Sequence, residues 1–472
     1  MDGTDESILS NPTILSNMPE HPSLIRALGL KEATALNMID MVGIGPFVVM
    51  PLVIKYMNGP QCIAAWIVGA LLALVDGSVW AELGARWPKA GGSYVFLREL
   101  YPRETWGRLL SFLFIWQTTI QAPLVIASGA IGFAQYAGYL VGLNPVTERL
   151  VRAGLIMFLI FILYRGIKTV GKISIFLWIG VIGTILWLVF AGATHFNPSM
   201  AFDYSNAPPI LSVAFFAMLG QASVKTVYSY LGYYNVCHLG GEIREPERVI
   251  PRSIFLSIFG IALLYLAMQL SVLGTIPWQE AKESSFIFST FIERIYGGDA
   301  ARIATLLILW IAAASLFAVI LGYSRIPFAA AQDGMFFKVF GKVHPTKHFP
   351  HVSLLILGLT GLIFSLLFRL SEVISAILAM RIIVQFIAQA VGVILLHRNK
   401  LERQKLPWRM WLFPLPALLA VVTWIWLFYS TGSEFALAGV AVIFVGIVIF
   451  LVRSNLEGAW PFAPDEQISA RH

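Results

Sequence analysis

Residues 37–53 read NMIDMVGIGPFVVMPLV, a long apolar run whose middle carries Gly43, Gly45 and Pro46. Glycine loosens the backbone and proline removes an N–H donor. The three residues therefore predict an interruption in a helix that the surrounding apolar residues otherwise favour. What such a break can do depends on the solvent around the helix.

The composition indicates that this solvent is a lipid bilayer. Hydrophobic residues make up 58% of the 472 residues, charged residues make up 12%, and the mean hydropathy is +0.76. These values lie outside the range of soluble domains. The net charge of +7 comes from Lys and Arg in short loops, which is typical of cytoplasmic loops and not of nucleic-acid binding. Cys62 and Cys237 lie in apolar runs and form no CxxC motif.

Runs of about 20 apolar residues predict twelve transmembrane helices. The predicted spans lie near residues 33–57, 60–84, 105–138, 150–165, 172–193, 210–240, 252–276, 301–328, 352–369, 372–396, 410–430 and 435–453. Basic loops alternate with mixed or acidic loops, so the positive-inside rule places both termini in the cytoplasm. We expect a multi-pass protein of the cell (inner) membrane.

The same pattern predicts the division of the chain. We expect a cytosolic N-terminal tail over residues 1–30, because this stretch is polar and has no apolar region like that of a signal peptide. A transport core over 31–398 follows, with spans eleven and twelve over 399–455 and a cytosolic C-terminal tail over 456–472.

The sixth predicted span repeats the anomaly of the first. Residues 223–242 read SVKTVYSYLGYYNVCHLGGE, and Gly232 and Asn235 interrupt the apolar run. Broken helices in matching positions of two halves mark the central site of a transporter. One helix end offers N–H groups to an anion and the other offers carbonyls to a cation, so the pair suits a zwitterion. A simple kink or close helix contact would explain either break alone.

Four stretches together resemble the amino acid, polyamine and organocation (APC) transporters, in particular bacterial amino acid permeases and L-type amino acid transporters. They are GIGPF (43–47), AELGARWPKAGGSY (81–94), YLGYYNVCHLGGEIREPERVIPRSI (230–254) and SRIPFAAAQDGMFFKVFGKVHP (324–345). The resemblance implies a leucine-transporter-type fold, a five-plus-five inverted repeat with spans one and six unwound and spans eleven and twelve appended. It also implies alternating access without a cofactor.

The resemblance further implies how an amino acid is held. The substrate carboxylate would bind backbone amides at the first break, and the amine would bind carbonyls at the second. The residues placed there are Met41, Gly43, Ile44 and Gly45 at the first break, and Tyr228, Ser229, Leu231 and Gly232 at the second. Tyr228 would be an aromatic lid, although packing in an aromatic-rich span also explains it. Ile44, Pro46 and Leu231 depart from the family pattern, which leaves the side-chain preference open.

Four ionisable residues lie well inside predicted spans: Asp40, Asp76, Lys225 and Arg381. An isolated charge at the bilayer centre costs on the order of 3 kcal/mol, so these side chains should face the bundle interior and pair. Asp76 and Lys225 lie at similar depth, roughly 24 Å from the outer ends of their spans. They could form a gating or proton-carrying network, or a static ion pair that fixes helix register.

Charges at the predicted cytosolic span ends have plainer interpretations. We expect Glu82 to be solvated or to cap a helix, and Glu242 to do the same or to form an inner gate with Arg244 or Arg252. Residues 86–106 predict a short amphipathic helix at the inner interface.

Amino acid transport is the function that this sequence favours. We find no nucleophile beside a base and no phosphate loop, so an enzyme is not indicated, and a channel would favour a repeated pore-lining motif. Neutral L-amino acids are favoured because Lys225 would repel a polycation near the second break. Asp40 supports the alternative of a polyamine or cationic amino acid transporter.

The sequence leaves exchange, uniport and proton symport open. The outer loop 142–149, GLNPVTER, lacks a cysteine, so the disulfide that links some relatives to a heavy subunit is not expected.

Overall fold

A computed structural model describes residues 24–205, 209, 212–367 and 370–462, and the side chains of 370–374 are not included. Within this part every regular element is a helix. The elements are α2 Leu30–Met41, α3 Gly45–Met57, η2 Pro60–Cys62, α4 Ile63–Arg86, α5 Ser93–Leu100, α6 Trp106–Val141, α7 Pro145–Leu163, α8 Ile167–Thr194, α9 Pro198–Ala201, α10 Val213–Tyr230, α11 Asn235–His238, η3 Gly240–Glu242, α12 Pro246–Leu273, α13 Trp278–Ala281, α14 Ile287–Tyr296, α15 Gly298–Tyr323, α16 Arg325–Gln332, η4 Lys338–Gly341, α17 His351–Leu367, α18 Leu370–Arg381, η5 Ile382–Ile387, α19 Ala388–Arg398, α20 Lys400–Gln404, α21 Leu415–Ser430 and α22 Ser433–Glu457.

Several of these helices are long and apolar enough to cross a membrane. In the described residues there are seven, and the bent pair α2 and α3 makes an eighth candidate. Each of the twelve predicted spans overlaps one or more helices, but α7 and α10 are not among the long apolar helices, and α17 and α21 are shorter apolar helices. The chain is therefore a multi-pass, all-helical membrane protein, and the count of twelve crossings stays a prediction. Most of both predicted tails, residues 1–23 and 463–472, lie outside the described residues.

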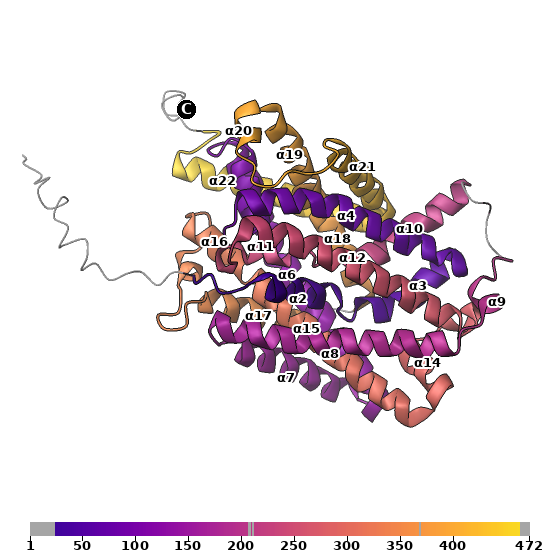
Figure 1. Cartoon of the computed structure of the whole chain (residues 1–472). Helices are drawn as coiled ribbons and strands as arrows, with labels where there is room; N and C mark the ends of the chain where they lie inside the picture. The colour runs from indigo at the N-terminus through magenta and orange to yellow at the C-terminus, as the bar shows by residue number, and fades with distance from the viewer. Residues whose placement is uncertain (1–23, 206–208, 210–211, 368–369, 463–472) are drawn as a thin grey trace, which may run out of the picture.

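The long helices run side by side in one bundle (Figure 1). The first described residues, α16, α20 and the end of α22 gather at one end of it, and α9 and α14 lie at the other. Helix α4 packs against α10, α12 and α21, whereas α6 packs against α15, α17 and α22. The two predicted breaks lie inside this bundle.

Both predicted breaks are present. Helix α2 ends at Met41, α3 begins at Gly45, and the two helices bend by 45° around residues 42–44. Helix α10 ends at Tyr230, and Leu231 is extended before Gly232 takes a φ of +120°. A Cβ on Gly232 would lie 2.7 Å from the Met41 backbone nitrogen, so glycine lets the two breaks touch.

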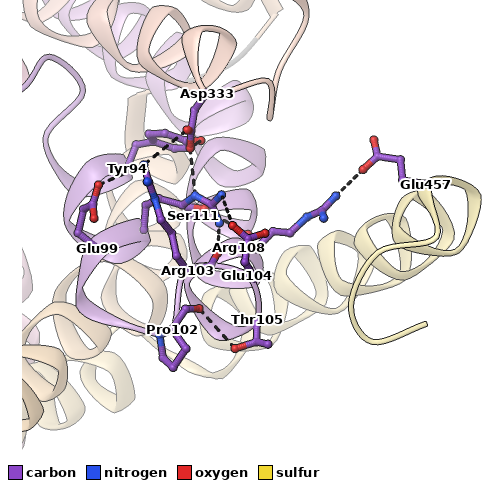
Figure 2. Close-up of polar contacts among 11 residues, drawn as sticks. Tyr94, Glu99, Pro102, Arg103, Glu104, Thr105, Arg108, Ser111, Asp333 and Glu457 are labelled. Carbon is purple, nitrogen blue, oxygen red and sulfur yellow. Dashed lines mark hydrogen bonds and ion pairs between the residues drawn. The ribbon is translucent and has the colours of Figure 1, made fainter. Parts of the chain in front are cut away.

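The segment predicted to be an amphipathic helix at the interface forms α5, but Phe96 and Leu97 are fully buried, so the helix packs inside the bundle. A polar cluster fixes it there (Figure 2). Asp333, just after α16, accepts a hydrogen bond from the Tyr94 hydroxyl at 2.9 Å and one from Arg98 Nε at 3.0 Å. Arg108 of α6 pairs with Glu457 of α22 nearby. These contacts tie α5 to the end of α16 and α6 to the end of α22.

Two acidic residues differ from the expectation that they are solvated or cap helices. Glu82 is fully buried, lies 2.6 Å from His397 Nε2 and accepts the Met410 N–H at 2.7 Å. Glu242 is also fully buried, and its partner is Arg325 of α16 instead of Arg244 or Arg252. In both cases a segment distant in the sequence folds back over the span end and excludes water.

The Glu242–Arg325 pair should contribute strongly to stability because both charges are buried. Arg325 donates to the two Glu242 carboxylate oxygens at 2.7 and 2.8 Å. Replacing either residue with Met should lower the free energy of unfolding by about 3–5 kcal/mol, because the other charge is left unpaired, and the double variant should recover most of this. Thermal unfolding of the purified protein measures the effect.

The exposed Glu280–Arg294 pair provides the matched control. Its single Met variants should change the unfolding free energy by less than about 1 kcal/mol. Purely additive losses at Glu242 and Arg325 would contradict the buried pair.

Candidate functional site

A small pocket of about 60 Å³ lies between the two breaks. Ten of the residues singled out in the sequence line it together. They are Asp40, Met41, Gly43, Ile44, Gly45, Tyr228, Ser229, Leu231, Gly232 and Arg381. Helix α6 adds Val125, Ser128 and Gly129 to the lining, and α15 adds Ser315, Leu316, Val319 and Tyr323.

The first break presents free backbone N–H groups to the pocket. Within the described residues, no backbone carbonyl accepts from the N–H groups of Gly43 and Ile44. Gly45 is the first residue of α3, where helical N–H groups have no intrahelical partner. A Cβ on Gly43 would lie 2.6 Å from Ser315 Oγ, so α15 packs directly on the break. This edge of the pocket therefore suits an anionic group.

The second break presents carbonyls and an aromatic side chain. The carbonyls of Val227 and Tyr228 accept from the Leu231 N–H at 3.1 and 3.3 Å. No backbone N–H of the described residues donates to the Leu231 carbonyl. The Tyr228 hydroxyl lies 3.0 Å from Ser128 Oγ of α6, so its ring spans the pocket between α10 and α6. This edge suits a cationic group.

Tyr265 of α12 joins the two breaks. Its hydroxyl lies 2.8 Å from the Met41 carbonyl and 3.1 Å from the Ser229 carbonyl, and the side chain is fully buried. One hydroxyl proton therefore stabilises carbonyl oxygens of both interrupted helices. Sequence reasoning missed this residue, because a single tyrosine in an otherwise apolar span looks like a packing residue.

Two of the four intramembrane charges face the pocket. Arg381 donates to the Tyr234 hydroxyl at 2.5 Å and to Gln385 Oε1 at 2.7 Å, and it precedes the π-helical turn η5. Such turns are frequent at functional sites. Asp40 lies in the lining with Arg381, but no ion pair joins them within the described residues. The pocket therefore contains one carboxylate and one guanidinium that are not neutralised by direct contact with each other.

The predicted pairing of Asp76 with Lys225 is wrong. Lys225 Nζ donates to Ser375 Oγ at 3.0 Å, whereas Asp76 accepts from Tyr233, Trp80 and Trp424. Thr226 donates to the Ala65 carbonyl, which places Lys225 beside the first turn of α4. Asp76 is about 11 residues further along α4, or roughly 16 Å. Counting from predicted span ends missed this offset.

A membrane-spanning helical bundle with a polar pocket between two broken helices is the architecture of a secondary transporter. The sequence model of the amino acid permease family matches residues 28–452. The chain therefore belongs to the amino acid permease family, which confirms the resemblance to APC transporters, and it is an amino acid transporter.

The names of its relatives give substrates of different charge. A serine/threonine exchanger of Bacillus subtilis (strain 168) is 23% identical over 85% of this chain and 90% of its own length. An aspartate-proton symporter of the same bacterium is 29% identical over 63% of this chain and 58% of its own. Cationic amino acid transporter 4 of Homo sapiens is 26% identical over 80% of this chain and 61% of its own length. Family membership therefore leaves the substrate class open.

We expect the Tyr265 hydroxyl to support transport more than stability. Tyr265→Phe removes only the bridge between the breaks, so the unfolding free energy should fall by about 1 kcal/mol while the KM for substrate rises several-fold. Tyr230→Phe is the matched control. Its ring packs against Tyr265 at 5.2 Å, and its buried hydroxyl has no hydrogen-bond partner in the described part of the chain. Equal transport kinetics in both variants would contradict a bridging role.

The separation of Asp76 and Lys225 predicts independent effects. Asp76→Asn and Lys225→Met should each reduce activity or stability, and the double variant should equal their sum within about 0.5 kcal/mol. A double-mutant cycle on thermal unfolding and uptake measures this. If the double variant recovers more than about 1 kcal/mol of the summed loss, Asp76 and Lys225 interact as an ion pair and the prediction of independence is wrong.

Proposed function

We propose that the protein carries small neutral L-amino acids across the cell membrane by alternating access, through exchange or proton coupling. The observation that carries the proposal is the small pocket that ends in backbone amides on one side and carbonyls on the other. A zwitterion is neutral overall and matches both ends. In this proposal Gly43, Ile44 and Gly45 bind the carboxylate, and Tyr228, Ser229 and Leu231 surround the amine.

The volume of the pocket supports a small substrate. A water-sized group needs about 10–15 Å³ of such space. A cavity of about 60 Å³ therefore holds roughly four to six such groups, close to the size of glycine, alanine or serine. The Ile44 side chain contributes to this limit, because it fills the space between the first break and Gly132 of α6.

A polyamine or cationic amino acid is the second candidate, and the presence of Asp40 in the lining favours it. Arg381 lines the same pocket, so the two side chains together add no net charge that would attract a polycation. Lys225 adds a further cation one turn before Tyr228 on α10. The neutral substrate is therefore the better match.

We also propose the leucine-transporter-type arrangement with twelve crossings, a five-plus-five inverted repeat over residues 31–398 and both termini in the cytoplasm. The two breaks, separated by five predicted spans, support the repeat. The described ends of the chain lie at one end of the bundle (Figure 1), and the basic loops around residues 86–103 and 244–252 lie there too. Transport then needs no cofactor, no chemical conversion of the substrate and no disulfide-linked subunit.

Reconstitution of the purified chain tests the substrate class. We expect the vesicles to accumulate radiolabelled alanine, serine or glycine faster than leucine, lysine or putrescine. Uptake is compared with and without internal amino acid, and with and without a pH gradient. Dependence on internal amino acid would assign exchange, and dependence on the gradient would assign proton coupling. Uptake of putrescine or lysine in preference to every neutral amino acid would overturn the proposal.

A further inference from the structure

A groove of about 760 Å³ lies on the outside of the bundle, far from the substrate pocket. One wall is the first part of α12, with Arg248, Arg252 and Phe255, and the other is the loop before α21, with Trp408 and Trp411. Its volume falls in the range of about 300–1,000 Å³ that is typical of ligand sites.

The mouth of the groove carries two arginines. Arg248 and Arg252 are exposed, and because they are four residues apart on α12 they lie on the same face. Within the described residues neither has an ion-pair partner, whereas Arg86, Arg98 and Arg108 at the same end of the bundle each pair with a carboxylate. Glu247 is the one carboxylate in the groove lining. The N-terminus of α12 adds further positive potential.

The floor and walls of the groove are apolar and aromatic. Leu256 and Phe259 of α12 are more than half exposed, although they are large hydrophobic side chains. Phe255 stacks on Trp411 at 5.5 Å and packs against Trp408 at 5.8 Å. Tryptophan is typical of the level of the lipid headgroups.

Contacts with α4 hold the loop that carries Trp408 and Trp411 in place. The Met410 N–H donates to the buried Glu82 carboxylate at 2.7 Å, and Arg86 donates to the Lys405 carbonyl at 3.1 Å. The loop is thereby fastened to α4 on both sides of Trp408. The groove is therefore preformed and does not need to be assembled by its ligand.

We propose that this groove binds one anionic phospholipid. The phosphate lies between the Arg248 and Arg252 guanidinium groups, which match phosphate geometry, and an acyl chain lies along Phe255, Leu256 and Phe259. A lipid is the occupant because the apolar groove opens outward at the interfacial end of a membrane-spanning helix, where cationic and apolar surface adjoin. A zwitterionic lipid satisfies the apolar surface but leaves the two arginines without a net anionic partner.

Occupancy would act on the helix that joins the two breaks. Tyr265 lies on α12 about 13 residues beyond Arg252, or roughly 20 Å along the axis. The lipid would link the near end of this helix to the loop that precedes α21.

Native mass spectrometry of the purified full chain tests the proposal, with phosphatidylglycerol titrated against phosphatidylcholine. The wild type should retain one phosphatidylglycerol at least about tenfold more tightly than phosphatidylcholine. Arg248→Gln with Arg252→Gln should weaken retention on the order of 30-fold, because each cation near an anionic lipid contributes about a factor of five. The matched control, Lys338→Gln with Lys342→Gln, removes the same charge at exposed positions outside the groove and should retain the lipid as the wild type does.

Three results would overturn the proposal. They are equal retention of the two lipids by the wild type, unchanged retention by the arginine variant, and an equal loss in the lysine control. If the arginine variant does not remain folded, Trp411→Ala decides, since it keeps both arginines and removes one wall. This variant should bind phosphatidylglycerol about tenfold more weakly, and unchanged binding would equally overturn the proposal. Because retention is measured without transport, the outcome is independent of the substrate proposed above.

Discussion

An interrupted helix inside a bilayer must find partners for the backbone groups that it frees, and the arrangement of this protein follows from that constraint. The breaks at residues 42–44 and 231–234 satisfy much of it through each other and through neighbouring helices. Gly232 brings the second break against the backbone of the first, and Tyr265 is shared between carbonyls of both. In the described part of the chain, the amides of Gly43 and Ile44 and the carbonyl of Leu231 have no backbone partner, and all three residues line the pocket.

The same constraint governs the buried charges, which are satisfied one by one and seldom by each other. Asp76 accepts hydrogen bonds from three side chains, and Lys225 donates one to a serine hydroxyl. Glu242 and Arg325 are the exception, because there the two charges meet in a bidentate pair. Asp40 and Arg381 remain in the pocket without a direct ion pair, where a zwitterion could interact with both.

The positions of the breaks could be predicted from Gly43, Gly45, Pro46 and Gly232, because backbone chemistry is local and can be recognised in any context. The residues lining the pocket came from the family resemblance placed on those breaks, and the structure brings them together. What failed depends on distant segments. Asp76 and Lys225 were paired by depth alone. Glu82 is covered by a segment more than 300 residues further along the chain, and no local sequence pattern predicts that contact. Tyr265 has no sequence signal, since its role depends on two carbonyls contributed by other helices.

Span eleven is more closely connected to the site than an appended helix would be. Trp424 of α21 donates to Asp76 at 2.9 Å, and the same carboxylate accepts from Tyr233, which lies within the second break. The Trp424 ring also stacks on the Phe386 ring, with 4.0 Å between their centres. The Arg381 guanidinium lies 5.2 Å from the centre of the Phe386 ring. A movement of the second break during alternating access would pull on Asp76 and would disturb these contacts unless α21 moved with it. Helix α21 is therefore coupled to the second break: it moves together with the break, or it opposes the movement of the break.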